Sequence, residues 1–386
     1  MATAPARPPT NAHPVRGLVE PAFSAVADVF AECVPADGPG GAFAVYVGGA
    51  PVIDVVSGLV GDGDRRWRTD TTCVIASGTK GVVATAVLVL LERGVMALDE
   101  PVATYWPEFA AAGKGLTRVG DIVAHTAGLV GIVEPITVEQ LADPPSIEAL
   151  LAAQAPIVPV GRPSYHELTY GWLCEALVRR VDGRSIGRFV EDEIAGPLGL
   201  DLSIGSPPER IARAARLQPS PDYQLSALLG DRPPDPRLAY VYGNPPIVGR
   251  MGEPELLAHE IPGANCLASA AAMARLYGCL AVGGTLEGVA LLDPMTIELG
   301  RTTRAHGEDP LTGRGLRFGV GFELNPNPSA LGPAADAFGH TGAGGSSHGA
   351  WPSRKVGYSF VTSQPRPETD DGRARRLLQT LDACLW

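Results

Sequence analysis

Lysine is scarce in this sequence, and positive charge is in the minority. The chain of 386 residues has only three lysines, Lys80, Lys114 and Lys355, and its formal net charge is −11 at pH 7. Binding to nucleic acid requires cations clustered against the phosphates. The charge balance therefore argues against nucleic acid as a partner, and no basic amphipathic segment points to an anionic membrane.

Long hydrophobic runs are also lacking. The longest apolar stretch, residues 82–91, is too short to span a bilayer and is followed by Glu92 and Arg93, so we expect a buried helix. Prolines interrupt the first residues, where a signal peptide needs a continuous apolar run. These features predict a cytoplasmic protein with a flexible leader over residues 1–20 and no membrane partner.

The six cysteines are widely spaced and form no C-x-x-C pair and no metal-ligand spacing with histidine. We therefore expect reduced cysteines in the core, with no metal and no cofactor. Hydrophobic residues make up 45% of the chain and charged residues 19%, which is typical of a globular protein rather than a disordered one.

The order of predicted elements indicates an α/β fold. Residues 41–58 predict a β-hairpin with a glycine turn, and residues 318–322 and 356–361 have the pattern of strands. The predicted helices cover residues 80–93, 173–181, 270–281 and 374–385. Strands at both chain ends predict an antiparallel sheet built from the two termini and flanked by helices, with a mainly helical region inserted between them.

This arrangement divides the chain into two lobes. We expect a sheet lobe made of residues 21–100 and 265–386, a mainly helical lobe over residues 101–264, and an active site between them. Prolines concentrate between residues 207 and 262. A long irregular stretch of this kind in a compact enzyme favours a substrate-facing lid.

The pair Ser77 and Lys80, in Ala76-Ser-Gly-Thr-Lys80, is the first candidate for chemistry. The two residues are one helical turn apart, so their side chains share a face. A desolvated lysine can lose its proton and act as a base, which an arginine cannot. A neutral Lys80 would activate Ser77 for attack on a carbonyl group, and the helix N-terminus would favour the oxyanion. Because the pattern is short, an ordinary surface serine and lysine is the alternative.

Three motifs in order give the chain a family resemblance. The segment Asp70-Thr-Thr-Cys-Val-Ile-Ala-Ser77-Gly-Thr-Lys80 resembles the nucleophile region of class C β-lactamases and their esterase relatives, within the serine β-lactamase and penicillin-binding protein superfamily. Residues 91–109 and 122–129 resemble the next two segments of the family. Tyr165-His-Glu167 then stands in the place of its Tyr-x-Asn motif, and His340-Thr-Gly342 in the place of Lys-Thr-Gly.

The resemblance implies a β-lactamase/transpeptidase-like fold and a serine enzyme that forms an acyl intermediate. It assigns Ser77 as the nucleophile, Lys80 as its base partner and Tyr165 as the second proton-relay group. His340 takes the place of the lysine in the third motif.

The resemblance also implies how the substrate is held. The N–H groups of Ser77 and Ala343 would form the oxyanion hole, which typically stabilises the transition state by several kcal/mol. Glu167, Thr341 and Gly342 would contact the substrate, which we expect to be a small ester or amide.

Two departures from the family pattern narrow the activity. Glu167 stands where β-lactamases carry an asparagine, and His340 replaces a permanent cation. The chain thus resembles the family's esterases (family VIII carboxylesterases) and transacylases, which predicts that an ester or thioester acylates Ser77 and that water, an amine or an alcohol accepts the acyl group. The alternatives are a β-lactamase or D-amino-acid peptidase and, in another class, a non-catalytic ligand-binding relative.

A rival serine motif lies near the C-terminus. Gly345-Ser-Ser347-His348-Gly349 fits the G-x-S-x-G elbow of α/β-hydrolases. That elbow needs a helix directly after it and a histidine later in the chain, but Ala-Trp-Pro follows and His348 is the last histidine. We therefore reject Ser347 as the nucleophile and interpret His125, in a His-Thr-Ala-Gly turn, as structural.

Overall fold

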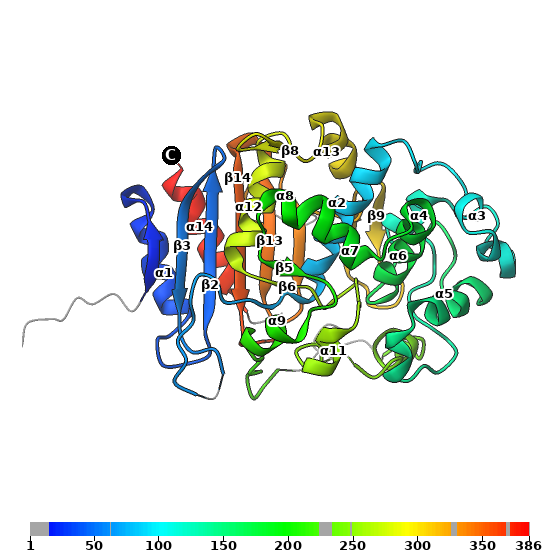
Figure 1. The fold of residues 1–386 in the computed structure, drawn as a ribbon, viewed down its shortest axis with the longest axis horizontal. Coiled ribbons are helices and arrows are strands. Elements are labelled where there is room, and N and C mark those ends of the chain that lie inside the picture. The colour runs from blue at the N-terminus through cyan, green and yellow to red at the C-terminus, as the bar shows by residue number, and fades with distance from the viewer. Residues whose placement is uncertain are drawn as a thin grey trace, which may run out of the picture.

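The computed structural model describes residues 15–61, 63–223, 234–247, 249–325, 330–367 and 371–385. Among these residues, nine strands form one antiparallel sheet to which both chain ends contribute, so the predicted fold class is confirmed (Figure 1). In spatial order the strands are β1 (Arg16–Val19), β3 (Ala50–Ser57), β2 (Gly41–Val47), β14 (Val356–Thr362), β13 (Ser346–Trp351), β12 (Phe338–Gly342), β11 (Glu323–Leu324), β10 (Gly315–Phe318) and β9 (Ala305–Glu308).

The hairpin of β2 and β3 joins the N-terminal part of the sheet to its C-terminal part. Gly48 and Gly49 form its turn with φ values of 59° and 87°, a conformation that glycine adopts without steric cost. On its other side β2 pairs with β14 along its whole length, from Gly41 opposite Thr362 to Val47 opposite Val356. The predicted hairpin and the predicted strand over residues 356–361 are both confirmed.

Helices cover both faces of the sheet (Figure 1). On one face, α1 (Ser24–Cys33) and α14 (Arg373–Cys384) bury an apolar cluster against alternate side chains of β2, β3 and β14. On the other, α12 (Ala270–Ala281) packs on β2 and β14. Its approach is close, because a Cβ atom on Gly357 would lie 2.4 Å from the Gly278 Cα atom. The helices α12 and α14 agree with the predictions from sequence, whereas α1 was not predicted.

The inserted region supplies most of the other helices. They are α2 (Thr79–Glu92), α3 (Val102–Tyr105), α4 (Val119–Val123), α5 (Pro144–Ala153), α6 (Thr169–Asp182), α7 (Ile186–Val190), α8 (Gly196–Leu198), α9 (Pro208–Arg213), α10 (Leu238–Tyr242), α11 (Pro254–Ala258) and α13 (Pro294–Arg301). Two small sheets pair β4 (Cys73–Val74) and β5 (Leu202–Ser203) with β6 (Leu267–Ala268), and β7 (Thr285–Leu286) with β8 (Val289–Ala290).

The helix α2 runs through the core and leads away from the nucleophile candidate. Its residues are buried from Thr79 to Leu90, and Gly94, with a φ of 67°, follows its end. The expected buried helix is therefore present. None of the helices within the described ranges is both long and apolar enough to cross a membrane.

Two expectations about the chain are wrong in part. The strand expected over residues 318–322 ends at Phe318, because Gly321 has a φ of 74° and its N–H donates to the Val123 carbonyl instead of to a neighbouring strand. The leader expected over residues 1–20 is too long, because Arg16–Val19 pair with β3 as the edge strand β1. Residues 1–14 lie outside the described part of the chain, as do residues 224–233 and 248 of the proline-rich stretch.

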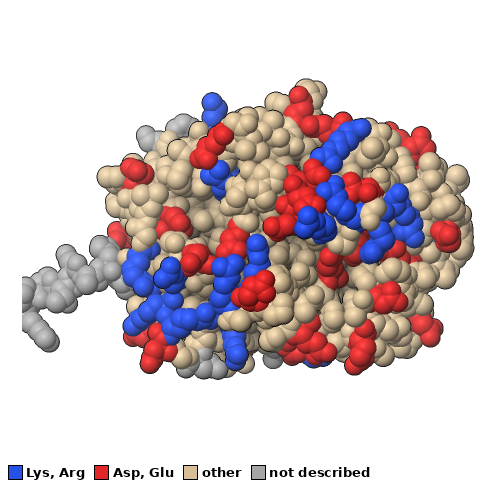
Figure 2. All heavy atoms as spheres, in the orientation of Figure 1, with Lys and Arg blue, Asp and Glu red and all other residues tan. Residues whose placement is uncertain are grey.

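Arginine carries most of the positive charge at the surface. Figure 2 shows basic and acidic side chains interleaved over one face, with the basic ones gathered most densely toward the lower left. Of the three lysines, Lys355 is exposed, whereas Lys80 and Lys114 are buried. The Lys114 Nζ atom donates to the carbonyls of Ala111 and Ala152, each at 2.9 Å, and so joins α5 to the turn η3 (Pro107–Gly113). This leaves Lys80 as the buried lysine beside a serine.

Candidate active site

Ser77 lies in the 3₁₀ turn η2 (Ala76–Gly78), directly before α2. The preceding Ala76 has a φ of 47°, a left-handed conformation that costs a residue with a Cβ atom roughly 1–2 kcal/mol. The Thr79 hydroxyl holds this turn, since it donates to the Ala76 carbonyl over 2.6 Å and accepts from the Cys266 N–H over 2.9 Å. A strained but anchored turn therefore presents Ser77 at the start of the helix.

The Lys80 amine lies next to the Ser77 hydroxyl, and the Lys80 side chain has no solvent exposure. Its Nζ atom donates to Ser77 Oγ at 3.2 Å, to the Glu167 carbonyl at 2.7 Å and to the Gly263 carbonyl at 2.8 Å. Burial lowers the pKa of Lys80 to about 8, with the Glu167 charge acting in the opposite direction. When the amine is neutral, two N–H bonds to carbonyls leave its lone pair directed at Ser77.

Glycine permits the approach of the Gly263 carbonyl to Lys80. A Cβ atom on Gly263 would lie 2.8 Å from the Leu168 carbonyl oxygen, and one on Gly171 would lie 2.1 Å from the Gly263 nitrogen. Both contacts are too short for any side chain, so the segment reaches α6 only because both residues are glycines. Sequence reasoning missed Gly263, which belongs to no recognisable motif.

Tyr165 packs over the Lys80 amine and contacts the same serine. Lys80 Nζ lies 4.8 Å from the centre of the phenol ring, and the phenol and the Ser77 hydroxyl are near enough to interact. Burial, together with the nearby Glu167 charge, raises the pKa of Tyr165 well above its usual range. The phenol is therefore neutral in the free protein. It can donate a proton, but it is not present as a phenolate that would act as a base.

His125 lies behind Tyr165 and away from Ser77. Its ring centre lies 4.9 Å from those of both Tyr165 and Tyr170, and its Nδ1 atom accepts from the His166 N–H at 3.1 Å. Burial lowers the pKa of His125 well below its usual range. A neutral, stacked ring in a turn with a φ of 61° fits the structural interpretation made from sequence.

His340 in β12 is a neutral imidazole beside Tyr165. Its side chain is 3% exposed, and burial lowers its pKa to about 4. The Nδ1–H group donates to the Thr341 carbonyl over 2.7 Å, which leaves Nε2 as an acceptor without a partner among the described residues. The ring centre lies 6.1 Å from that of Tyr165, so the two rings are neighbours but are not joined by a hydrogen bond.

The rest of the third motif runs past the nucleophile turn. Glu323 Oε2 accepts from both the backbone N–H and the hydroxyl of Thr341, at 3.2 and 3.0 Å. A Cβ atom on Gly342 would lie 2.4 Å from the Ile75 carbonyl oxygen, so glycine lets β12 touch the residue before η2. Ala343 follows and lines the cavity next to Ser77.

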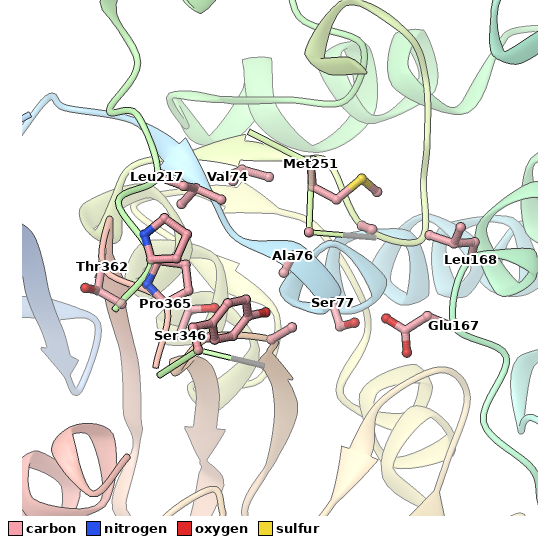
Figure 3. Close-up of a pocket in the computed structure, with 16 residues that line it drawn as sticks. Val74, Ala76, Ser77, Glu167, Leu168, Leu217, Met251, Ser346, Thr362 and Pro365 are labelled. Carbon is pink, nitrogen blue, oxygen red and sulfur yellow. The ribbon is translucent and has the colours of Figure 1, made fainter. Parts of the chain in front are cut away.

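Two pockets meet at Ser77. The first has a mainly apolar wall that includes Val74, Leu168, Leu217, Met251 and Pro365 (Figure 3). The second includes Tyr165, Arg314, Phe318, Glu323, His340 and Thr341. Ser77, Glu167 and Ala343 line both pockets, and the side chains of Ser77 and Glu167 point toward each other. A carbonyl group held at Ser77 would thus place one substituent in each pocket.

Several of these residues escaped the sequence analysis. Arg314 and Glu323 precede the third motif without any pattern of their own, and Leu217 and Met251 lie in the proline-rich stretch. The proline-rich composition was the one signal that pointed toward the apolar wall, because it suggested a segment that faces the substrate.

The rival serine is placed differently. Ser347 lies within β13, opposite Thr341 on one side and Phe360 on the other, and is not at a turn from a strand into a helix. It lines neither pocket at Ser77. Its neighbour His348 is hydrogen-bonded through Nδ1 to the Ser359 hydroxyl at 2.8 Å. The geometry of a nucleophile elbow is therefore absent from this segment.

Histidine, cysteine, aspartate and glutamate side chains among the described residues are the candidates for holding a metal ion. Across the ranges that the structure describes, no group of three or more histidine, cysteine, aspartate or glutamate side chains is arranged to hold a metal ion. The six cysteines are unpaired, and all but Cys384 are buried.

The chain is similar to known proteins over most of its length. The profile of the family described as β-lactamase matches residues 26–382. The esterase/β-lactamase LipL of Mycobacterium tuberculosis is 36% identical over 363 residues, which cover 90% of this chain and 82% of LipL. A penicillin-binding protein homologue from Caulobacter crescentus superimposes with a TM-score of 0.89 at 35% identity, covering 96% of this chain and 99% of the other. A family VIII carboxylesterase gives the same TM-score and coverage at 32% identity.

Proposed function

The chain belongs to the β-lactamase family, and on that premise we propose that it is a serine esterase or transacylase that forms an acyl-Ser77 intermediate. The observation that carries this proposal is the 3.2 Å contact between Ser77 Oγ and the buried Lys80 amine. A buried lysine whose pKa is lowered, next to a serine at a pocket, is the arrangement expected of an activated nucleophile. The names of LipL and of the family VIII carboxylesterase support an ester as the substrate.

In the first half of the reaction, Lys80 takes the proton from Ser77 and the Oγ atom forms a bond to the carbonyl carbon of the ester. The N–H groups of Ser77 and Ala343 hold the resulting oxyanion. When the intermediate collapses, the bond to the leaving oxygen breaks. Tyr165 gives its proton to that oxygen and regains one from Lys80, which leaves acyl-Ser77, a free alcohol and a neutral amine.

In the second half, water or an acceptor attacks the acyl-enzyme. Lys80 takes the proton of the attacking group, the acyl carbon gains its new bond, and the bond to Ser77 Oγ breaks as the proton returns to that oxygen. Water yields a carboxylic acid, whereas an amine or alcohol acceptor yields an amide or a new ester. The two outcomes differ in how well the pockets exclude water and hold the acceptor.

The leaving alcohol and the acyl group of the substrate occupy different pockets. A leaving alcohol needs a proton, and Tyr165, which supplies it, lines only the polar pocket. The leaving group therefore departs through the polar pocket, and the acyl chain lies against the apolar wall with Leu217 and Met251. This assignment favours esters with an apolar acyl group.

The lobes expected from sequence remain our proposal for the domain organisation, with residues 21–100 and 265–386 in one and 101–264 in the other. It is supported by the way that Lys80 of the first lobe bonds to the carbonyls of Glu167 and Gly263 in the second. Leu217 and Met251 at the apolar pocket support a substrate-facing role for the stretch 207–262.

We also propose a cytoplasmic site of action. Its support is chemical: five buried, unpaired cysteines suit a reducing compartment, where disulfides are rare.

The direct test combines a covalent probe with a substrate panel. A fluorophosphonate should label Ser77, as located by mass spectrometry of the digested protein, and p-nitrophenyl esters of increasing acyl length should be turned over. Leu217→Trp should shift the preference toward shorter acyl groups, because the indole fills the apolar pocket. Absence of both labelling and turnover would identify the chain as a non-catalytic relative, and labelling at another serine would refute the assignment of the nucleophile.

A further inference from the structure

We propose that the polar pocket selects esters whose leaving alcohol carries a positive charge, above all a quaternary ammonium group, and that Glu167 and Glu323 are the residues that determine this preference. The inference rests on the proposed esterase function, because it concerns the group that leaves from acyl-Ser77.

The charged side chains of the polar pocket are mainly acidic. Glu167, Glu323 and Arg314 line it, and His340 in the same wall is neutral because burial holds its pKa at about 4. Arg314 is exposed, whereas both carboxylates are half-buried, so water screens the guanidinium more than the carboxylates. The pocket therefore offers a region of negative potential next to Ser77.

The pKa of Tyr165 reflects this excess of negative charge in the pocket. The charges of Glu167 and Glu323 each raise the pKa of its phenol more than the Arg314 charge lowers it. The Lys80 amine, which is also close, lies under the phenol ring instead of in the pocket wall, and it is uncharged when it acts as the base. A cation in the pocket thus meets a net attractive field during acylation.

Glu323 is held in place for such a role. Both donors of Thr341 reach the same carboxylate oxygen, Oε2, which orients the group toward the pocket that it lines. A carboxylate has about four acceptor directions on its two oxygens, and Thr341 uses two of them. Thr341 does not use the other oxygen, Oε1, so the charge of the carboxylate remains available to a cation in the pocket.

Aromatic side chains complete the chemistry. Tyr165 and Phe318 both line the polar pocket, with ring centres 6.0 Å apart and planes inclined by 24°. Aromatic rings beside a carboxylate favour a quaternary ammonium group, which cannot donate hydrogen bonds but interacts with ring quadrupoles. This combination favours a quaternary ammonium over a small primary amine.

A matched pair of esters tests the inference. Butyrylcholine and 3,3-dimethylbutyl butyrate have the same acyl group and nearly the same shape, and differ in the charged nitrogen that replaces a carbon. We expect kcat/KM to be roughly tenfold or more higher for butyrylcholine at low ionic strength, with the ratio falling as salt is added. The ratio is the readout, because it cancels effects on the chemistry at Ser77.

Variants link the ratio to the two carboxylates. Glu323→Gln keeps an oxygen acceptor for Thr341 but removes the charge, and we expect it to lower the ratio severalfold, as should Glu167→Gln. Glu298→Gln, which removes an exposed carboxylate on α13 that lines neither pocket, should leave the ratio unchanged. If a variant fails to fold, an inhibition experiment on the wild-type protein serves as the test instead. Tetramethylammonium should inhibit p-nitrophenyl butyrate hydrolysis competitively at a lower concentration than neopentyl alcohol.

The outcomes separate this inference from the proposed function. Turnover of both esters with a ratio near one, or equal inhibition by the charged and neutral compounds, would overturn the cation preference and leave the esterase intact. Failure of both esters, together with absent fluorophosphonate labelling of Ser77, would overturn the esterase and the inference with it.

Discussion

The Tyr165 backbone N–H donates to the Asp309 carboxylate over 2.9 Å, across 144 positions of the chain. The other carboxylate oxygen accepts from the Ser164 hydroxyl at 3.0 Å and from the Leu311 N–H at 2.9 Å. The Asp309 side chain is only 2% exposed, so these bonds act away from water. Asp309 therefore holds the segment that carries the candidate proton relay, and acts on Ser77 only through Tyr165.

Asp309→Ala should lower kcat about tenfold or more with a smaller change in KM, because Tyr165 loses its anchor while the pockets keep their walls. Three donors would also lose their acceptor, which should destabilise the fold by about 2–4 kcal/mol. Asp309→Asn, which keeps one oxygen acceptor, should recover part of both losses. Steady-state kinetics and thermal unfolding measure the two effects. A destabilised variant with wild-type kcat at temperatures where it is folded would make Asp309 purely structural.

Ser77→Ala should abolish turnover and fluorophosphonate labelling without loss of the fold, because removal of one hydroxyl leaves no large cavity. Ser347→Ala, at the serine of the rival motif, should keep most of the activity, since Ser347 lies within a strand and lines neither pocket. Intact-mass measurements after exposure to the probe compare the two variants directly. Labelling that persists in Ser77→Ala would show that another residue is the nucleophile.

Lys80→Arg and Lys80→Met should each reduce kcat/KM by about 10²–10⁴-fold, because neither side chain can accept the Ser77 proton. In the wild-type protein, kcat/KM for an uncharged ester should rise with pH through an ionisation near 8, the pH at which the buried amine loses its proton. Below that pH the amine is charged and the rate should fall about tenfold per unit. If the Lys80→Met variant keeps a rise in kcat/KM near pH 8, the ionisation belongs to another group.

Tyr165→Phe should lower kcat by about 10²–10³-fold while changing KM little. The phenylalanine ring keeps the packing against His125 and Phe318, so the variant removes the hydroxyl alone. An ester with a very acidic leaving alcohol, such as p-nitrophenol, should suffer less than an alkyl ester, because it departs without a proton. Equal losses for both esters would place the role of Tyr165 in positioning and not in proton transfer.

Esters should be turned over far faster than penicillins or cephalosporins. The pocket carries Glu167 and a neutral His340, so a β-lactam carboxylate meets repulsion from Glu167 and no permanent cation from His340. A strained β-lactam ring should still acylate Ser77 slowly and then block it. Nitrocefin hydrolysis beside p-nitrophenyl butyrate hydrolysis provides the measurement, and comparable rates would move the protein to the β-lactamase side of its family.

The Ser77–Lys80 pair and the motif around His340 show how much of the site could be predicted from sequence. The three-residue spacing of Ser77 and Lys80 predicted a shared face, and the structure has their polar atoms 3.2 Å apart. The family resemblance likewise pointed to His340 as a residue of the site, and its ring centre lies 6.1 Å from that of Tyr165. Arg314 and Glu323 could not be predicted as site residues, because the sequence around them is that of an ordinary strand or turn.

The sequence by itself determined what depends on near neighbours along the chain: the hairpin of β2 and β3, the helices α2, α12 and α14, and the serine–lysine turn. Only the tertiary structure decided the state of Lys80. The carbonyls of Glu167 and Gly263 come from 87 and 183 residues away, and burial by the surrounding core lowers the pKa of the amine. Desolvation depends on which distant segments pack together, so the spacing of residues along the chain does not predict it.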